Sequence, residues 1–354
     1  MRKTLALALS FLMSSALLCS PADAQTTTVK VGWCAKTITS AAAPFAIATK
    51  MGWFRDAGVN VDLVPLAGSS DCAKLVATGD VTFALASIEP VIPLRLQGVK
   101  EKVFYTAYQG NIYGFAVPAD SPVKSIKDLR GKKIGVASMA SGAVPVARAL
   151  LADNGLDPQK DAQIVVVGEA AQAAALVRSH QVDALSIYDT QYALIQNAGV
   201  PLRPLDMGLI AKYPSNGFLA LEGTLKKNRA QALAVAKGYA MGTIFALANP
   251  EAAVKILFDV YPQTKPTGKT EEQSIHDDVL VLNARAEHWK LEAGGVKRWG
   301  ESNVGMFDAY EDFLLKQNVI TQKVPANDLV TNDLVADVNK LDAAKIAATA
   351  KAYK

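Results

Sequence analysis

Two serine-bearing loops are the segments of this sequence best suited to chemistry. Residues 66–71 (Leu-Ala-Gly-Ser-Ser-Asp) and 137–143 (Ala-Ser-Met-Ala-Ser-Gly-Ala) each lie between a predicted strand and a predicted helix. Hydroxyl groups and free N–H groups at the start of a helix bind an oxyanion without a full counter-charge. The alternative is that Ser70 or Asp71 and Ser141 only cap their helices, and both interpretations stay open. The candidate ligand-binding residues in these loops are Ser69, Ser70, Ser138, Ser141 and Gly142.

Other loops at the ends of predicted strands supply aromatic and polar side chains. Ligands of open α/β sheets sit beyond the carboxyl ends of the strands, so these side chains are expected to face the same ligand. Aromatic rings among them can stack on it. The two acids can meet an ammonium group of the ligand, unless they are solvated or paired with a lysine. These further candidates are Trp33, Thr37, Ser87, Glu89, Gln109, Asn111, Tyr113, Tyr188 and Asp189.

Catalytic and metal-binding patterns are sparse. His180, His276 and His288 fall on predicted helices or at a helix end, away from the strand-end loops, and the sequence has no H-E-x-x-H, C-x-x-C, Walker A or G-x-G-x-x-G motif. Ser141 stands at a strand-to-helix turn but lacks the preceding glycine of G-x-S-x-G. We therefore interpret Ser141 as a binding residue and expect no metal, no cofactor and no enzymatic activity. A secreted serine hydrolase using Ser141 is the alternative from a different class.

Two cysteines, Cys34 and Cys72, are expected to form a disulfide. Cys34 follows the first predicted strand, and Cys72 opens the helix after the second. Neighbouring parallel strands end at the same edge of a sheet, and export permits oxidation. The alternative is a pair of buried free thiols.

A βαβαβ pattern that occurs twice positions these residues. Short Val/Ile-rich strands alternate with Ala-rich helices, which indicates parallel sheets covered by helices on both faces. Two doubly wound α/β lobes of one design imply a cleft between them. The predicted strands are 29–33, 61–64 and 83–86 in the first copy and 133–136, 164–167 and 185–187 in the second, and the predicted helices include 71–78, 145–152 and 170–178.

The order of segments predicts how the chain moves between the lobes. Residues 113–118 and 216–221 are extended and are interpreted as crossings. After residue 225 the spacing is helical, over 230–249, 250–260, 271–282 and 304–317, and this helical tail is expected to pack on the first lobe. The predicted organisation is a signal peptide (1–24), the first part of lobe 1 (25–114), lobe 2 (115–217), and the return of the chain to lobe 1 (218–354).

Bulk properties point to an exported protein. Met1–Ala24 has a basic start, an apolar stretch and small residues before Gln25, which is typical of a cleavable secretory signal with cleavage near Ala24. The chain has 37 basic and 33 acidic residues, of which Arg2, Lys3 and Asp23 lie in that signal, so the remainder carries a charge of +3. Near neutrality without a basic run disfavours a nucleic-acid partner.

Several short motifs resemble a known family. They are Lys50-Met51-Gly52-Trp53-Phe54, Ala57-Gly58-Val59, Thr78-Gly79-Asp80-Val81, Val182-Asp183-Ala184 and the run Ser125-Ile126-Lys127-Asp128-Leu129-Arg130-Gly131-Lys132-Lys133-Ile134-Gly135-Val136. Together they look like the periplasmic solute-binding proteins of ABC importers in the nitrate, sulfonate and taurine group, which also includes binders of thiamine-precursor pyrimidines. The resemblance covers essentially the whole chain after the signal.

The resemblance implies a type II periplasmic binding protein with its ligand in the cleft. Ser69, Ser70, Ser141 and Gly142 match the anion-binding loops of the family, and Tyr188-Asp189-Thr190 stands where the family usually has a tripeptide that begins with tryptophan. We expect a periplasmic monomer that closes by a hinge near Gly114 and Gly217 and delivers its solute to an ABC permease in the inner membrane. The first choice of solute is a small sulfonate- or taurine-like organic anion, and the second is a flat aromatic or pyrimidine. A sensing role beside a membrane receptor is a further alternative.

Overall fold

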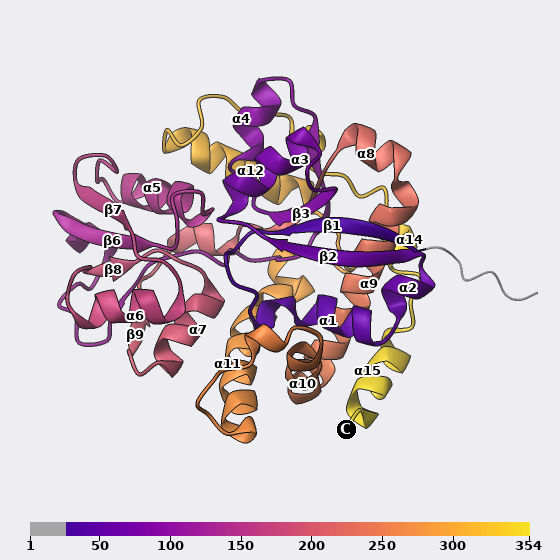
Figure 1. Ribbon diagram of the computed structural model, residues 1–354. Coiled ribbons are helices and arrows are strands. Elements are labelled where there is room, and N and C mark those ends of the chain that lie inside the picture. The colour runs from indigo at the N-terminus through magenta and orange to yellow at the C-terminus, as the bar shows by residue number, and fades with distance from the viewer. Residues whose placement is uncertain (1–25) are drawn as a thin grey trace, which may run out of the picture.

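Two five-stranded sheets form the centres of two lobes (Figure 1). The computed structural model describes residues 26–354, so the predicted signal segment lies outside the described residues. The strand order is β2-β1-β3-β10-β4 in the first sheet and β7-β6-β8-β5-β9 in the second. The predicted class, two α/β lobes with a helical C-terminal region packed on the first lobe, is confirmed.

The first sheet places the ends of three parallel strands at the edge that faces the second lobe. Its central strand β1 pairs in parallel with β2 and β3, so that Val31 lies opposite both Leu63 and Phe83. Strand β10 is antiparallel to β3 and β4. The strands of this sheet are β1 (Thr27–Trp33), β2 (Val59–Pro65), β3 (Phe83–Ala86), β4 (Glu101–Thr106) and β10 (Gly217–Leu221).

The second sheet repeats this arrangement with shorter strands. Strand β6 pairs in parallel with β7 and β8, and β5 is antiparallel to β8 and β9. The third predicted strand of the second copy, 185–187, is only the two-residue β8. The strands are β5 (Ala116–Pro118), β6 (Lys132–Val136), β7 (Ala162–Val166), β8 (Ala184–Leu185) and β9 (Leu202–Pro204).

Each sheet also contains one antiparallel strand, which the predicted parallel sheets did not include, and the crossings explain why. Strand β4 ends at the edge that faces the other lobe, and the chain then passes directly into β5. A strand that enters a sheet from that edge must run away from it, opposite to strands that end there. The same holds for β10 after the return crossing, so each sheet contains one antiparallel strand immediately after a crossing.

Helices cover both sheets and make up the C-terminal region. In the strand–helix repeats they are α1 (Ala43–Lys50), α2 (Trp53–Asp56), α3 (Ser69–Thr78), α4 (Val91–Leu96), α5 (Ala143–Asp153), α6 (Ala170–Arg178) and α7 (Asp189–Asn197). After β10 they are α8 (Glu222–Lys227), α9 (Arg229–Ala248), α10 (Pro250–Val260), α11 (Glu271–Trp289), α12 (Val304–Lys316), α13 (Ala326–Leu329), α14 (Val335–Val338) and α15 (Ala343–Ala352). Short 3₁₀ turns lie at Ser40–Ala42, Ile126–Leu129, Gly208–Lys212, Pro262–Thr264 and Leu291–Gly294.

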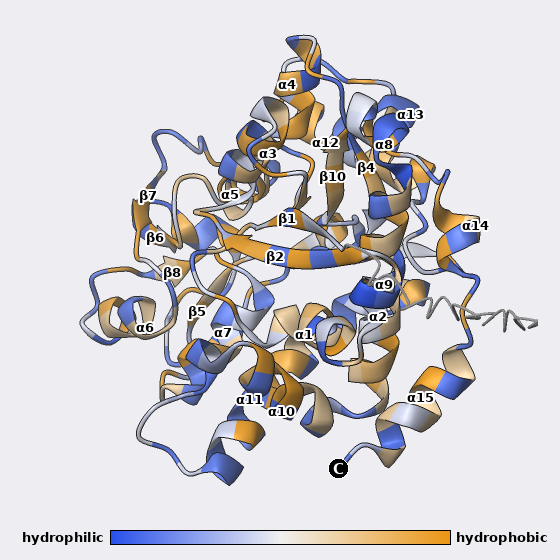
Figure 2. Ribbon diagram, turned by 45° about the vertical axis from the view of Figure 1, so that its right-hand side comes forward, coloured by the Kyte–Doolittle hydropathy of each residue, from blue (hydrophilic) through white to orange (hydrophobic). Residues whose placement is uncertain are grey.

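An aromatic cluster joins the first sheet to the helices beneath it. The Phe45 ring of α1 lies 4.9 Å from Tyr239 of α9 and 5.8 Å from Phe218 of β10. Offset and edge-to-face ring pairs at such distances add about 0.5–1.5 kcal/mol each beyond the area they bury. Figure 2 shows hydrophobic residues along β1 and β10 and hydrophilic residues on the outer loops. This cluster makes the first lobe a stiff base for the loops that follow its strands.

Helix α9 is long and apolar enough to cross a membrane by length and composition. In the fold, however, 67% of its apolar window is buried against other elements, chiefly α1, α10 and α15. Burial of this kind is typical of the central helix of a globular lobe. Helix α11 extends from the same region and contacts α7 of the second lobe. The C-terminal region therefore touches both lobes, whereas only the first was expected.

Candidate functional site

A small cavity lies between the lobes, at the strand ends. Its volume is about 30 Å³, which leaves room for water but not for a drug-sized ligand, since pockets of that kind hold about 300–1,000 Å³. Any larger solute therefore requires the lobes to part. The cavity is lined by Trp33, Cys34, Ala35, Leu85, Tyr108, Ile112, Tyr113, Tyr188, Asn216 and Arg285.

Four aromatic side chains from separate segments surround this cavity. Trp33 ends β1, Tyr108 and Tyr113 belong to the first crossing, and Tyr188 precedes α7 in the second lobe. All four are less than 10% exposed. The Tyr113 and Tyr188 rings meet edge to face, with centroids 6.4 Å apart and planes at 90°. Of the predicted site residues, Trp33, Tyr113 and Tyr188 thus line one cavity, and the sequence prediction had missed Tyr108.

The hydroxyl of Tyr113 sits in a polar cluster where the lobes meet. It donates to Asn216 Oδ1 at 3.2 Å, and Ser69 Oγ accepts from the Ser87 amide at 3.2 Å. Among the described residues, Ser87 Oγ is buried without a hydrogen-bond partner. A Cβ on Gly142 would lie 2.6 Å from Ser87 Oγ and 2.8 Å from Tyr113 Oη. Only glycine therefore lets the second lobe approach this cluster so closely.

Glu89 lies behind that cluster and does not line the cavity. Tyr310 of α12 donates to Glu89 Oε1 at 2.5 Å, while Oε2 is buried without a partner in the described part of the chain. Burial raises the pKa of Glu89, and the hydrogen bond from Tyr310 opposes that rise. The structure thus pairs Glu89 with a tyrosine. The sequence had predicted a contact with the ligand, with a solvated or lysine-paired carboxylate as the alternative.

The second predicted acid, Asp189, forms a buried ion pair with Arg285. Arg285 Nε and Nη2 donate to the two carboxylate oxygens of Asp189 at 2.7 and 2.5 Å. The guanidinium carbon lies 4.1 Å from the centroid of the Tyr108 ring. The side chains are 3% and 8% exposed. Asp189 is therefore neither solvated nor paired with a lysine, and Arg285 of α11 is the charged residue that borders the cavity.

His288 lies beside the Asp189–Arg285 pair, which corrects the expectation that all three histidines are remote from the strand-end loops. Its Nε2 is 3.9 Å from Asp189 Oδ2. Burial is the largest influence on the imidazole and lowers the pKa of His288, so its neutral form is favoured. The expectation failed because α11 continues to Trp289, beyond the predicted end at Leu282.

Two groups of hydrogen bonds join the lobes at the rim of the cleft. In the first, Ser138 Oγ donates to the Ala67 carbonyl, and the Ser70 amide donates to the Ala140 carbonyl at 3.0 Å. A Cβ on Gly68 would lie 2.3 Å from that Ala140 oxygen. The serine loops predicted to hold a ligand therefore meet each other directly when the cleft is closed.

In the second group, Glu169 of lobe 2 reaches the loop after β1. Its carboxylate accepts from the Lys36 amide, the Thr37 amide and Thr37 Oγ1, the last at 2.6 Å, and from the Tyr188 hydroxyl. The next residue, Ala170, has a φ of +44°, a backbone region that costs non-glycine residues about 1–3 kcal/mol. Thr37 thus contacts a carboxylate from the opposite lobe, a partner that the sequence did not indicate.

The remaining predicted residues have local roles. Ser141 Oγ accepts from the Ala143 amide, and Ser70 lies inside α3, whose N-cap is Gly68 without a side-chain cap. Capping by Ser70 or Asp71 is therefore wrong. Gln109 donates to the carbonyls of Thr106 and Glu301, and Asn111 Oδ1 accepts from the Tyr113 amide. Both amide side chains shape the crossing and do not reach the cavity.

The expected disulfide is present between Cys34 and Cys72, whose Cα atoms are 5.9 Å apart. It joins the loop after β1 to α3, two segments that face the second lobe. Crosslinking across 38 residues stabilises a fold by about 4 kcal/mol in the chain-entropy model. The bond therefore holds one wall of the cavity in place.

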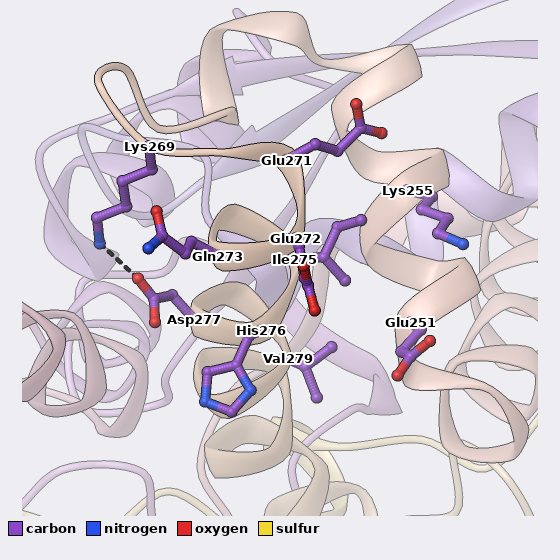
Figure 3. A pocket seen from close by; sticks show the side chains of 10 residues that line it. All are labelled: Glu251, Lys255, Lys269, Glu271, Glu272, Gln273, Ile275, His276, Asp277 and Val279. Atoms are coloured by element: carbon purple, nitrogen blue, oxygen red, sulfur yellow. Dashed lines mark hydrogen bonds and ion pairs between the residues drawn. The ribbon is translucent and has the colours of Figure 1, made fainter.

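A wider hollow of about 910 Å³ lies on α10 and the first half of α11 (Figure 3). Its side chains are mostly charged and exposed, and Figure 3 shows Lys269 paired with Asp277 on one side of the hollow and Glu251 and Lys255 of α10 on the other. Solvated charges at an open surface bind little, because water and salt screen them. No group of His, Cys, Asp and Glu in the described residues could hold a metal ion. The cavity between the lobes is therefore the stronger candidate site.

Comparisons with known proteins agree with this geometry. A family model described as NMT1/THI5 like matches residues 39–253, more than half of the chain. The riboflavin-binding protein RibY of Chloroflexus aurantiacus is 23% identical over 296 residues, which cover 83% of this chain and 82% of RibY.

Solved structures with the same fold include two binding proteins that are named for their ligands. The alkanesulfonate-binding protein SsuA of Xanthomonas axonopodis bound to MOPS aligns with a TM-score of 0.65 and 17% identity, over 87% of this chain and 99% of SsuA. The periplasmic nitrate-binding protein NrtA of Synechocystis aligns with a TM-score of 0.58 and 15% identity, over 93% of this chain and 99% of NrtA. At these identities the likeness concerns the fold, and it agrees with two lobes around a cleft.

Proposed function

Since this chain belongs to the NMT1/THI5-like family and has the fold of the solute-binding proteins of ABC importers, we propose that it captures a flat, ring-containing solute. The observation that carries this proposal is the aromatic lining of the cavity. Trp33, Tyr108, Tyr113 and Tyr188 come from both lobes and the crossing between them. Ring faces on opposite sides of a cleft can hold a flat molecule by stacking when the lobes close.

The charge of the cavity supports the same ligand class. Arg285 is paired with Asp189, and Glu169 is satisfied by amides and hydroxyls of the first lobe. An organic anion that entered this cavity would find no cation without a partner among its lining residues. RibY is named for binding riboflavin, whose ring system is flat and uncharged. A heteroaromatic solute, including a flavin or a pyrimidine, is therefore our first candidate.

Hinge motion is the second part of the proposal. We assign residues 25–114 and 218–354 to lobe 1 and 115–217 to lobe 2, with hinges near Gly114 and Gly217. A Cβ on Gly114 would lie 1.9 Å from Met207 Sδ, and a Cβ on Gly217 would lie 2.6 Å from the Tyr105 carbonyl oxygen. The two crossings are therefore closely packed at these glycines. The lobes part to admit the solute and close on it, because the closed cavity is too small for entry.

The partners follow from the family. The protein acts as a periplasmic monomer, exported by a signal that ends near Ala24, and presents its closed form to an ABC permease in the inner membrane. Solute-binding proteins with these partners need no cofactor, since the permease and its ATPase supply the work of transport. A membrane receptor that senses the closed form is the alternative partner, and a permease and ATPase gene beside this one would favour transport.

A small organic anion, such as a sulfonate or taurine, is the second candidate solute. It is favoured by the start of α5, where Gly142 meets the Ser87 hydroxyl, which has no hydrogen-bond partner within residues 26–354. The positive end of the helix dipole there would suit an oxyanion once the lobes part. A serine hydrolase would instead need a general base beside Ser141, and Ser141 Oγ has the Ala143 amide as its partner.

The function is tested by a thermal-shift screen followed by calorimetry. The ligands are lumichrome, riboflavin and a hydroxymethylpyrimidine, against taurine, an alkanesulfonate and nitrate. We expect a ring compound to raise the melting temperature most. Tyr188→Leu should weaken its binding about tenfold, because the ring face is lost. The matched control Tyr188→Phe keeps the face and should bind nearly as tightly. Stabilisation by taurine or nitrate alone would overturn the aromatic assignment.

A further inference from the structure

We propose that Asp189 is a specificity-determining residue: by neutralising Arg285 it makes the cavity reject organic anions and accept uncharged rings. This inference deepens the proposed function and rests on it for the location of the solute. It concerns the charge that the solute carries, which the aromatic lining alone does not determine. An unpaired arginine at the same place would favour an anionic ring compound.

The pair is built to keep Arg285 occupied. Two of its nitrogens donate to the two oxygens of Asp189, which is the bidentate geometry of strong arginine–carboxylate pairs. The guanidinium lies over the Tyr108 ring, with its carbon 4.1 Å from the ring centroid. Asp189 is held from its own side as well, because it is the first residue of α7 and its Oδ1 accepts from the Thr190 amide at 2.7 Å.

A histidine also lies beside the pair in the described part of the chain. The imidazole of His288 is 3.9 Å from Asp189, and burial favours its neutral form. Tyr108 and Tyr239 lie beside the guanidinium, and Trp289 Nε1 donates to the Tyr239 hydroxyl. One positive and one negative group therefore face each other at the end of the cavity, and they cancel.

This arrangement discriminates by charge. An incoming sulfonate or carboxylate would approach a guanidinium whose two forked donors are in use, and it would lie beside the carboxylate that uses them. Like charges repel strongly where water is excluded. An uncharged ring carries no such penalty and can still hydrogen-bond through carbonyl and N–H groups at its edge. Asp189 thus lets the cavity discriminate between solutes that have similar shapes but different charges.

A purely structural role is the competing explanation, since the pair also joins α7 of lobe 2 to α11 of the C-terminal region. That role predicts a loss of stability when Asp189 is replaced, but no change in the kind of ligand bound. The two explanations therefore differ in ligand selectivity, which calorimetry measures separately from stability.

The test uses two probes of nearly identical shape, 2-naphthalenesulfonamide and 2-naphthalenesulfonate, which differ in charge. Calorimetry measures both on the wild type, Asp189→Asn and the control Glu169→Gln. Asp189→Asn frees the charge of Arg285, so its affinity for the sulfonate should rise by at least about tenfold while that for the sulfonamide changes little. Glu169→Gln removes a carboxylate of the same lobe that does not touch Arg285, and it should show no gain. An unchanged sulfonate affinity in Asp189→Asn overturns the inference.

A second variant protects the test against poor folding. Asp189→Ala should melt at a lower temperature, and formate or methanesulfonate should restore that temperature in a saturable manner by taking the place of the missing carboxylate. Glu169→Ala should show no such rescue, and absence of rescue in Asp189→Ala contradicts the inference. The gain in sulfonate affinity and the rescue of the melting temperature are both measured on the Asp189 variants. The proposed function, in contrast, fails if no ring compound stabilises the wild type, so the two failures can be told apart.

Discussion

Two carboxylates of the second lobe reach the first, and their surroundings give them different roles. Asp189 is 8% exposed and holds a guanidinium at the end of the cavity. Glu169 lies at the rim and accepts from the amides of Lys36 and Thr37, two exposed residues. Water competes for the second set of bonds and not for the first. Burial, more than the number of bonds, should decide which acid controls stability and selectivity.

The largest effect is expected from Arg285→Gln. Removing the guanidinium leaves Asp189 buried without its partner, and breaking a buried pair in this way costs about 3–5 kcal/mol. Denaturant unfolding measures the loss. Arg298→Gln is the matched control, because Arg298 is exposed and pairs with Glu301 on the surface. A loss below about 1 kcal/mol for Arg285→Gln would contradict the importance of burial.

Removing the disulfide tests how strongly it constrains the loop after β1, which forms one wall of the cavity. The double variant Cys34→Ser and Cys72→Ser should lower the free energy of unfolding by about 4 kcal/mol, because a 38-residue separation is no longer crosslinked. The melting temperature of the wild type should fall on reduction, and that of the variant should not. Equal melting temperatures for the oxidised wild type and the variant would show that the bond does not constrain this wall.

Glu101 sharpens the comparison, because it is a buried carboxylate without a partner. Both its oxygens lack hydrogen bonds among the described residues, and burial raises the pKa of Glu101 to about 8. A carboxyl whose pKa is higher in the folded state binds its proton on folding. Its contribution to stability is therefore lost as the pH rises from about 4.5 to about 8.

Glu101→Gln should accordingly be more stable than the wild type at pH 8 by at least about 1 kcal/mol, and the difference should shrink towards pH 4. Melting curves of both proteins across that range measure it. A difference that does not depend on pH would show that Glu101 is ionised in the fold.

Gly68→Ala tests whether the two lobes must meet closely at the rim of the cleft. The added methyl group would lie 2.3 Å from the Ala140 oxygen of the other lobe, and Gly68 has an extended backbone that any residue can adopt. The lobes should then fail to close, and the affinity for a ring compound should fall by at least about tenfold because the closed form is less populated. Gly223→Ala, with no atom near the added Cβ, is the control. Unchanged affinity would mean that closure at this rim is not needed.

The smallest effect is expected from Glu169→Gln. Its partners are two exposed backbone amides and the hydroxyls of Thr37 and Tyr188, at a rim that water reaches, so the free energy of unfolding should change by about 1 kcal/mol or less. Chemical denaturation compares it with Arg285→Gln. If the rim variant lost as much stability as the buried one, the contrast between the two acids would be wrong.

The sequence predicted what local patterns control. The helices 170–178 and 250–260 begin and end at the expected residues, because Gly168-Glu169 and Asn249-Pro250 interrupt the chain there. The β4 strand and the direction of β5 and β10 were missed, because they depend on where the chain crosses between the sheets. Such crossings leave no local composition signal.

The residues of the site likewise divide into those that the sequence predicted and those that it missed. Trp33 and Tyr188 were predicted because they lie where a predicted strand ends, and Tyr113 because it begins the extended segment 113–118. Arg285 was not, because nothing in its helix distinguishes it from other basic residues. Its partner Asp189 lies 96 positions away in sequence. Contacts over such separations appear only once the helix α11 is seen to run past Leu282 to reach the second lobe.

Small-angle scattering of the wild type, with and without a saturating ring compound, tests the central claim most directly. The account predicts that the free protein is more extended in solution than the closed structure, and that the ligand shifts it to the closed dimensions. A scattering profile that stays unchanged, while calorimetry shows that the same compound binds, would contradict capture by closure of the two lobes.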